Sequence, residues 1–568
     1  MTSQSKTSLG LPPFFASCIV KHREAMKRTL RSGCQITSGF ATSEPSLFYR
    51  DLWDFIVEND LTGITIRQAL FMAPHRICLG DAPSAKGVLE GVRDLIPELL
   101  AKLPQPIASL SSLITEAASK ADKMSKKLVA LYRLMEHYKE LERRRIHFIT
   151  PFMGTTLSVG IPDHPAFRAA FPEFAGRNTT RMGITTFHPL HFTDAADSIA
   201  SGPDSQHEDG VTVMVLTPPD ERGFLSHGPT NAVNPEILEM LADHGRSKLI
   251  LYINSTYPFT EGWPDAPNTI HIDRLKPLAE AGKLFVVLDE TPVPTSPKGS
   301  VTSPSITEQA IARHLVNHIE MNPELTHGRA IQVGIGRTGV QAMRLLQDSS
   351  WSGRLYTEML EPYTLELFES GKIKGSHFVE KNGQRVQLDG KLVCTFTMCE
   401  KGSDFYRKLD HNPALILAPA SRVVIPEAFY HGLGINNCLG IDFHGHVNAS
   451  GRGRNHHSGM GGLANIVRGL TRGGVAYFCM KSTHRNEEGE RRSSIFPYLP
   501  RGTPISLVGP DLLGFREGGR VFLITEHGVA DLTGKNQARY IRELIRVAHP
   551  DFRPWLKKAA FREFRVAF

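Results

Sequence analysis

Strongly apolar runs alternate with helical segments through most of the chain. Three such runs, Val211–Leu216, Lys248–Ile253 and Lys283–Leu288, have the near-continuous apolar character of parallel strands covered on both faces. Between them, Pro235–Gly245 ends on glycine, which is typical of a helix C-terminus. This alternation predicts an α/β fold with mainly parallel sheets.

Two segments interrupt the alternation. Residues 289–305 are rich in proline, serine and threonine. We interpret residues 291–305 as a linker between an N-terminal domain (1–290) and a C-terminal domain (306–568) that opens with a helix. Residues 83–145 are patterned as helix almost throughout, which predicts a helical insertion in the first domain. Such an insertion packs on its host domain, or serves as a lid or an oligomer contact.

Composition narrows the class of protein. The chain is 41% hydrophobic and 22% charged, as is typical of a globular enzyme, and its net charge of +7 suits a small polyanionic ligand. We see no basic run interleaved with aromatics, so we expect no nucleic acid partner. The seven cysteines form no C-x-x-C pair, which fits a reducing compartment. No apolar run reaches the roughly 18 residues of a membrane span.

The N-terminus bears on localisation. The first acidic residue is Glu24, which is weakly like a transit peptide, but the arginine-rich amphipathic pattern is missing. We therefore expect a cytoplasmic protein, or one of the mitochondrial matrix in a eukaryote.

A glycine-rich loop is the first candidate for chemistry. Residues 331–346 read as an apolar strand, a turn with the spacing Gly334-x-Gly336-x-x-Gly339, and a helix. That form cradles phosphates, and Glu358 lies about where a nicotinamide enzyme would bind the ribose. Two interpretations of the loop are therefore open: the dinucleotide site of a dehydrogenase, and a tight turn that binds no ligand. Against the dehydrogenase, a helix and the linker precede the loop, and no histidine or lysine is placed for hydride transfer.

Together with the motifs C-terminal to it, this loop carries a resemblance to a known family. The stretches that carry it are VGIGRTGV (333–340), YTEML (356–360), INNCLGIDFHGHVNAS (435–450), SGMGG (458–462), TEHGVADLTGK (525–535) and AHPDFR (548–553). In the first half, Ser32–Leu52 and Thr217–Gly228 also fit. In order and spacing the chain resembles the acetyl-CoA hydrolase/transferase family of class I CoA-transferases, such as the succinyl-CoA:acetate and 4-hydroxybutyrate CoA-transferases.

The resemblance implies a fold and a set of catalytic residues. It implies two similar α/β domains of the CoA-transferase type with the active site between them. It implies that Glu358 is the nucleophile, that Asn436 lies beside it, and that Glu526 is a second active-site glutamate. Gly461 or Gly462 would belong to the oxyanion site.

The resemblance also implies a coenzyme A site. The CoA-contacting residues would be Gly334, Ile335, Gly336, Arg337 and Thr338, with Arg485 where a CoA-contacting lysine is expected. Arg337 and Thr338 depart from the family's apolar or small residues, and Gly440 stands where the family has a glutamate. These departures affect acyl specificity more than the class of reaction.

Moving CoA between acids while keeping the thioester energy requires a carboxylate on the enzyme. We therefore predict a CoA-transferase acting on small carboxylic acids through a glutamyl-CoA thioester. CoA and acyl-CoA would be substrates, with no permanently bound cofactor, and the family suggests a homodimer or larger oligomer. The alternatives are an acyl-CoA hydrolase on the same scaffold, an NAD-dependent dehydrogenase, and a CoA-binding sensor without turnover.

Two remaining features have simpler interpretations. His444, His446, His456 and His457 lie close in sequence, but their spacing matches no ligand pattern, so we expect polar loop residues and no metal. The segment Trp555–Phe568 is a basic amphipathic helix candidate. We expect it to pack on the fold, with a membrane surface or a calmodulin-like groove as alternatives.

Overall fold

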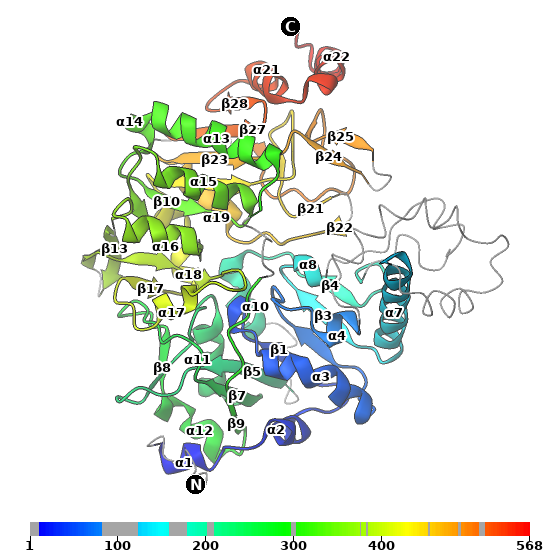
Figure 1. Cartoon of the computed structure of the whole chain (residues 1–568), viewed down its shortest axis with the longest axis vertical. Coiled ribbons are helices and arrows are strands. Elements are labelled where there is room, and N and C mark those ends of the chain that lie inside the picture. Colours follow the sequence, from blue (N-terminus) through cyan, green and yellow to red (C-terminus); the bar gives the residue numbers. More distant parts are fainter. Residues whose placement is uncertain are drawn as a thin grey trace, which may run out of the picture.

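The computed structural model describes residues 11–81, 123–157, 179–201, 210–296, 303–374, 376–381, 384–452, 455–486, 490–509 and 517–568. Two α/β lobes lie one above the other along the long axis (Figure 1). We call residues 11–296 the N-terminal half and residues 303–568 the C-terminal half. Helix α1 (Pro13–Ala16) and helix α22 (Arg553–Phe564) lie at opposite ends of the molecule.

The N-terminal half is built on a wholly parallel sheet. Within the described residues its seven strands are ordered β4 (Thr185–Phe187), β3 (His147–Thr150), β2 (Thr65–Arg67), β1 (Gln35–Ser38), β5 (Gly210–Leu216), β7 (Lys248–Asn254) and β9 (Leu284–Asp289). The apolar runs of the sequence became β5, β7 and β9. Most of their side chains are buried on both faces because helices cover the sheet, but Leu288 of β9 is 48% exposed.

The C-terminal half has a second sheet of the same kind. As far as the chain is described, its six strands are ordered β11 (Arg354–Leu355), β10 (Ala330–Val333), β18 (Leu433–Asn437), β23 (Val475–Cys479), β27 (Arg520–Thr525) and β28 (Gly528–Asp531). All pairs are parallel except β27 with β28. The predicted α/β fold with mainly parallel sheets is confirmed.

Helices cover both sheets. The longer ones are α2 (His22–Thr29), α3 (Ser46–Glu58), α11 (Asn234–His244), α13 (Ile306–Met321), α15 (Arg337–Gln347), α16 (Pro362–Glu369), α19 (Leu463–Leu470) and α21 (Gln537–Val547). Helix α11 ends as predicted, with Gly245 in the left-handed conformation (φ 57°). Helix α13 begins with a capping box between Ser305 and Glu308.

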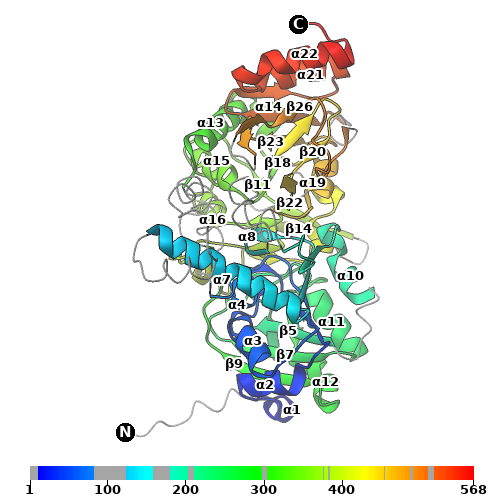
Figure 2. The same cartoon turned by 90° about the vertical axis from the view of Figure 1, so that its right-hand side faces the viewer.

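The helical insertion is described only in part. Helix α7 (Lys123–Arg143) is its C-terminal portion and packs along the N-terminal half (Figure 2). Leu134, Tyr138 and Leu141 of α7 are fully buried. Residues 82–122 lie outside the described residues, so the insertion as a whole stays a prediction. The domain boundaries and the linker also stay predictions, since residues 297–302 lie outside the described ranges.

The two halves share one apolar core. It joins Phe40 and Leu238 of the N-terminal half to Phe396 and Leu470 of the C-terminal half. Phe40 packs edge-on against Phe396, with ring centroids 5.8 Å apart. Backbone hydrogen bonds also cross the junction, because Thr397 N donates to the Pro229 carbonyl at 3.0 Å. A site at this junction is therefore held from both sides.

The chain ends on a packed helix. Helix α22 lies against α21, with Leu556 and Ala560 fully buried and Trp555 47% exposed (Figure 1). This agrees with the expectation of a packed terminal helix. No helix in the described ranges is long and apolar enough to cross a membrane.

Candidate active site

Most of the predicted site residues lie at one edge of the second sheet. Parallel strands end at a common edge, where ligands of open α/β sheets bind. Gly334 follows β10, Asn436 lies at the end of β18, Ser482 follows β23, and Glu526 follows β27. The parallel sheet thus brings together residues that are far apart in the sequence.

Two hydrogen bonds join the glycine-rich loop to the neighbouring strand, β18. Gly334 N donates to the Ile435 carbonyl at 2.7 Å, and Asn437 Nδ2 donates to the Ile335 carbonyl at 2.9 Å. Gly336 has φ +141°, and a Cβ there would lie 2.8 Å from Asn437 Nδ2. Only glycine fits this conformation and this close approach. At Gly336 the backbone of the loop is therefore not covered by a side chain.

Helix α15 begins directly after the loop, at Arg337. Arg337 and Thr338 occupy its first turn; Arg337 is half-buried and Thr338 is 7% exposed. Backbone N–H groups at such a helix start are ready donors for phosphate oxygens, and arginine can bind phosphate bidentately.

Glu358 lies in a short connection between β11 and β12 (Met359–Leu360). Its carbonyl oxygen accepts hydrogen bonds from Thr395 N (3.0 Å) and Phe396 N (3.3 Å). On the other side, the Thr395 carbonyl accepts from Asn231 N of the N-terminal half at 3.0 Å. The segment that carries Glu358 is thus fixed through Thr395 to the opposite half.

The Glu358 segment also touches the loop. The hydroxyl of Thr357 accepts a hydrogen bond from Val333 N at 3.3 Å and donates to the Met359 carbonyl at 3.1 Å. Val333 directly precedes Gly334. Thr357 therefore ties the predicted nucleophile to the predicted CoA loop.

The carboxyl group of Glu358 faces the second glycine cluster. Gly462 N donates to Glu358 Oε1 at 3.2 Å. Burial raises the pKa of Glu358 to about 7, and the bond from Gly462 acts in the opposite direction. Gly462 is the N-cap of α19, so the positive end of that helix also faces the carboxyl group.

Glycine is required beside this carboxyl group. A Cβ on Gly462 would lie 2.2 Å from Val424 Cγ1 and 3.3 Å from Glu358 Oε2, and one on Gly461 would lie 3.6 Å from Glu358 Oε1. The Gly461 carbonyl accepts from Phe192 N at 3.2 Å, in the 3-10 turn η2 (Phe192–Asp194) of the N-terminal half. Residues of both halves therefore position this cluster.

Asn436 is buried beside the loop. It is 3% exposed, and its Oδ1 lies 3.7 Å from the position of a Cβ on Gly334. Among the described residues its Nδ2 has no hydrogen-bond partner. The same holds for both amide atoms of Gln332, a 1% exposed residue of β10. Because an unpaired buried amide is costly, these two donors and one acceptor are suited to a polar ligand or to water.

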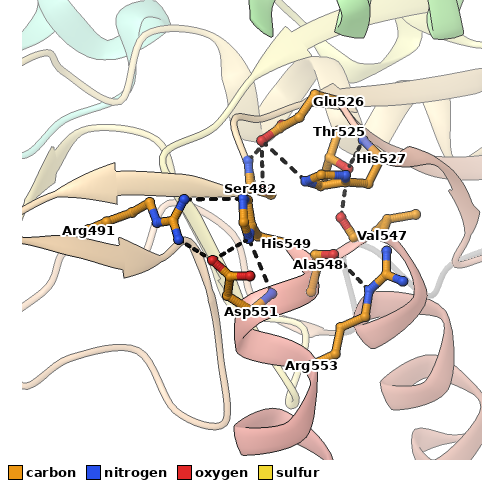
Figure 3. A network of polar contacts seen from close by, with 10 residues as sticks. All are labelled: Ser482, Arg491, Thr525, Glu526, His527, Val547, Ala548, His549, Asp551 and Arg553. Carbon is orange, nitrogen blue, oxygen red and sulfur yellow. Dashed lines mark hydrogen bonds and ion pairs between the residues drawn. The ribbon is translucent and has the colours of Figure 1, made fainter.

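Glu526 is held by hydroxyl, backbone and histidine groups (Figure 3). Ser482 donates from N (3.0 Å) and from Oγ (2.6 Å), one bond to each carboxylate oxygen, and His527 Nε2 lies 3.7 Å away. Glu526 has no hydrogen bond to Glu358 among the described residues. The structure thus brings Glu526 to the sheet edge that carries the loop, but not into direct contact with Glu358.

The surroundings of Glu526 reach the C-terminal motif. The rings of His527 and His549 pack edge-on at 5.1 Å, and Arg491 pairs with Asp551 (Figure 3). Arg553 Nε donates to the Ala548 carbonyl at 3.0 Å. The TEHG and AHPDFR stretches, far apart in the sequence, therefore form one network.

Arg485 lies on a hairpin beyond Ser482. It ends β24 (Thr483–Arg485), which pairs with β25 (Arg491–Ser493), and it is exposed. The sheet edge therefore has a cation three residues from Ser482.

The histidine cluster does not converge. His446 Nδ1 lies 3.1 Å from Asp442 Oδ2, whereas His456 stacks on Phe187 of the N-terminal half at 3.9 Å. Within the described residues, no group of three or more histidine, cysteine, aspartate or glutamate side chains is placed to hold a metal ion.

Comparison with known proteins shows which proteins this chain is similar to. Residues 402–560 match the acetyl-CoA hydrolase/transferase C-terminal domain. The butyryl-CoA:acetate CoA-transferase of Anaerostipes caccae is 25% identical over 68% of this chain and 78% of its own. The 4-hydroxybutyrate coenzyme A transferase of Clostridium kluyveri is 25% identical over 77% of this chain and 90% of its own. These matches support assignment of the chain to the acetyl-CoA hydrolase/transferase family, whose C-terminal domain residues 402–560 resemble.

The relatives of this chain include hydrolases as well as transferases. The acetyl-CoA hydrolase of Kluyveromyces lactis is 24% identical over 61% of this chain and 64% of its own. RipA from Yersinia pestis has the same fold, with a TM-score of 0.64 at 19% identity over 97% of this chain and 98% of its own. The 4-hydroxybutyrate CoA-transferase from Porphyromonas gingivalis aligns with a TM-score of 0.56 at 18% identity, over 97% and 99%.

Sequence reasoning missed several residues that shape the site. Thr357 and Thr395 hold the Glu358 segment, Gln332 lies in the buried amide pair, and Ser482 binds Glu526. Gln332 and Thr357 adjoin motifs that were recognised, so their position in those motifs was an available signal. Thr395 has no such signal, because only tertiary pairing brings it to Glu358.

Proposed function

We propose that this enzyme is a CoA-transferase that moves CoA between small carboxylic acids through a thioester on Glu358. The observation that carries the proposal is the Glu358 carboxyl group, which accepts a hydrogen bond from Gly462 N at 3.2 Å, on a segment that Thr357 ties to the start of the glycine-rich loop. A carboxylate placed against a backbone donor can act first as a nucleophile and then as an electrophile.

The reaction begins with attack on the acyl-CoA. A carboxylate oxygen of Glu358 attacks the acyl carbonyl carbon, the C–S bond breaks, and CoA leaves as thiolate. An acyl-glutamyl anhydride remains. The thiolate then attacks the side-chain carbonyl carbon of Glu358, and the bond from that carbon to the bridging oxygen breaks. The first acid leaves as carboxylate, and Glu358 carries CoA as a thioester.

The second acid reverses these steps. Its carboxylate attacks the glutamyl thioester, CoA thiolate leaves, and the new anhydride is opened by the thiolate at the acyl carbon. Acyl-CoA is released and Glu358 is regenerated as carboxylate. No water or external proton enters the balance, so the thioester energy is conserved.

Gly462 supports both stages. Each attack on the Glu358 carbonyl develops negative charge on a side-chain oxygen of Glu358. Gly462 N already points at such an oxygen, and it stands at the positive end of α19. Removing one such donor in an oxyanion site typically costs about 100-fold or more in rate.

The glycine-rich loop would bind the CoA phosphates. The exposed Ile335, the uncovered backbone of Gly336 and the helix start at Arg337 offer donors and a cation at the sheet edge. We assign Asn436 to orientation of the reacting carboxylate, because its Nδ2 is buried and has no partner among the described residues. Two further residues would act from the same edge of the sheet. Glu526 would act on the acyl or carboxylate group, and Arg485 on a CoA phosphate.

Hydrolysis is the second candidate, since the relatives include acetyl-CoA hydrolases. It needs water at the anhydride or thioester of Glu358. Because Glu358 is only half-buried, a small molecule can reach it. Transfer requires that the second acid reach it before water does.

A product-resolved assay tests the proposal. Purified enzyme is incubated with acetyl-, butyryl- or succinyl-CoA and a ¹³C-labelled acceptor acid, and both acyl-CoA products and free CoA are quantified. We expect labelled acyl-CoA to form without net loss of thioester, and Glu358→Gln to abolish it. The matched control is Glu369→Gln, an exposed glutamate of α16 paired with Lys408.

Other outcomes assign other functions. Free CoA without labelled acyl-CoA indicates a hydrolase. Binding of CoA with neither product indicates a sensor, and reduction of NAD with no CoA chemistry would revive the dehydrogenase.

A further inference from the structure

Helix α22 packs on the fold with one side and exposes the other. It lies at the outer end of the C-terminal half, beyond α21 (Figure 2). Its buried side is made of small and apolar residues: Leu556, Ala559 and Ala560. An α-helix turns by about 100° per residue, so four exposed positions follow one another within roughly a third of the circumference. They alternate aromatic and cationic character: Trp555, Arg562, Lys558 and Phe561.

The exposed aromatic side chains of the described residues gather at this end of the molecule. The four most exposed are Tyr498 (51%), Trp555 (47%), Phe561 (56%) and Phe568 (53%). Tyr498 joins the helix through Phe564, with ring centroids 5.6 Å apart. A group of large apolar side chains left in solvent is typical of an interaction surface.

The residues after α22 fold back and hold this surface in place. Val566 is 4% exposed. Arg542 of α21 donates two hydrogen bonds to the Ala567 carbonyl, from Nε at 3.2 Å and from Nη2 at 3.0 Å. Phe568 is thereby set beside Lys557, whose Nζ lies 5.3 Å from the ring centroid. The aromatic and cationic groups are therefore positioned before a partner binds.

The surface is also strongly basic. Residues 553–568 hold five basic side chains and one acidic one, a net charge of +4 against +7 for the whole chain. The acidic residue, Glu563, is paired with Arg562. Lys557 and Lys558 are exposed and form no ion pair among the described residues. Such a surface attracts an anionic partner.

We propose that the exposed side of α22 docks on an anionic phospholipid bilayer, with its aromatic rings among the headgroups and its lysines against lipid phosphates. Exposed tryptophan and phenylalanine rings gain by entering the headgroup region, and each basic residue near an anionic leaflet adds affinity. Because α22 lies at one end of the long axis, a flat surface reaches it without meeting the N-terminal half (Figure 1).

A second copy of this chain fits the surface less well than a bilayer does. A two-fold contact places the same patch of both copies face to face, so a net charge of +4 would meet +4. Docking on lipid is independent of the proposed reaction, because it needs no acyl-CoA.

Sedimentation of the full chain with sucrose-loaded vesicles tests this inference. We expect binding to vesicles made of equal parts of phosphatidylserine and phosphatidylcholine, little binding to phosphatidylcholine alone, and weaker binding as salt rises. Lys557→Gln/Lys558→Gln should bind about fivefold more weakly per lysine removed. The matched control is Lys21→Gln/Lys27→Gln, which removes the same charge from exposed positions at α2, at the opposite end of the molecule (Figure 1).

Tryptophan fluorescence shows whether α22 makes the contact. The chain has four tryptophans, and Trp53, Trp263 and Trp351 are at most 8% exposed, against 47% for Trp555. Brominated phosphatidylcholine in the anionic vesicles should therefore quench Trp555. In Trp555→Phe the protein should still sediment with the vesicles, but the quenching should disappear.

Four results would overturn the inference: no binding to anionic vesicles, equal binding to neutral vesicles, unchanged affinity in the double lysine variant of α22, or binding without quenching of Trp555. Binding of heparin but not of vesicles would assign the surface to another polyanion and would equally overturn it. Thermal melting verifies that each variant is folded. Because no acyl-CoA is present, these outcomes and those of the transferase assay are separate.

Discussion

Gly462 N donates a 3.2 Å hydrogen bond to Oε1 of Glu358, although 104 residues separate the two in the sequence. The bond joins the N-cap of α19 to the connection after β11. It gives a half-buried carboxyl group one fixed backbone donor. That arrangement is the physical basis of the proposed chemistry, because it orients the nucleophile and stabilises charge on the same atom.

We predict that Gly462→Ala lowers both stability and turnover. The new Cβ would lie 2.2 Å from Val424 Cγ1 and 3.3 Å from Glu358 Oε2, so the backbone must shift away from Glu358. Overpacking of this kind costs about 1–3 kcal/mol, and loss of the donor lowers turnover roughly 100-fold. Denaturant unfolding and steady-state kinetics measure the two effects. Adding Val424→Ala should recover part of both, and wild-type turnover in the single variant would contradict the assigned role.

The pH dependence of the attack on acyl-CoA should reflect ionisation of the Glu358 carboxyl group. Its pKa is raised to about 7 by burial, and only the ionised form is a nucleophile. The single-turnover rate of CoA release should therefore rise with pH, about tenfold per unit below pH 7, and level off above it. Circular dichroism at each pH verifies that the enzyme stays folded. A rate that is flat across pH 7 would show that Glu358 ionisation does not control the step.

Asn437→Ala should weaken binding of acyl-CoA more than it slows chemistry. The substitution removes the 2.9 Å bond that holds the Ile335 carbonyl, so the glycine-rich loop loses its fixed shape. We expect the KM for acyl-CoA to rise roughly tenfold while kcat changes little. Asn412→Ala is the control, because this half-buried asparagine likewise donates to a backbone carbonyl, that of Lys408. If kcat alone fell, the loop would serve the chemistry and not the binding of CoA.

Glu361→Gln should stabilise the fold increasingly as pH rises. Burial first, and repulsion from Glu400 second, raise the pKa of Glu361 to about 8 in the folded state against an ordinary value of 4.5, so the unfolded state loses its proton first. Wild-type stability should therefore fall, relative to the variant, between about pH 4.5 and 8, and the difference should be constant above that range. We expect a change of about 5 kcal/mol across the window, from denaturant unfolding at each end. If the difference in stability between the wild type and Glu361→Gln did not change with pH, Glu361 would not be the group that ionises in this range.

Local patterns in the sequence predicted the sheets and the loop well. Residues 211–216 and 248–253 are apolar enough to require burial on both faces, and the spacing Gly334-x-Gly336 has few uses besides a close approach of backbone. The order of strands in each sheet could not be read in this way, because pairing depends on contacts between segments far apart. The pattern pointed to Glu358 only as a ribose-binding carboxylate, and the resemblance alone gave it the role of nucleophile and singled out Asn436.

The contacts that tune the site were beyond sequence reasoning. Val424, which closes the space behind Gly462, belongs to no recognised motif, and Glu361 meets Glu400 only because β12 pairs with β16 (Phe396–Thr397). Arg485, three residues after Ser482, was singled out by the resemblance, but nothing local indicated that the hydroxyl of Ser482 would bind Glu526. Burial and tertiary pairing set the pKa values of these carboxyl groups, and neither is encoded in nearby residues.

The central claim is that CoA becomes covalently attached to Glu358, and one measurement tests it directly. The enzyme is incubated with an acyl-CoA, treated with borohydride, digested, and analysed by mass spectrometry. Borohydride reduces a glutamyl thioester to an alcohol, which leaves a fixed mass change on one peptide. We expect that change on the peptide that contains Glu358, only when acyl-CoA was present, and not in Glu358→Gln. Acyl exchange without any modification of that peptide would contradict a covalent role for Glu358.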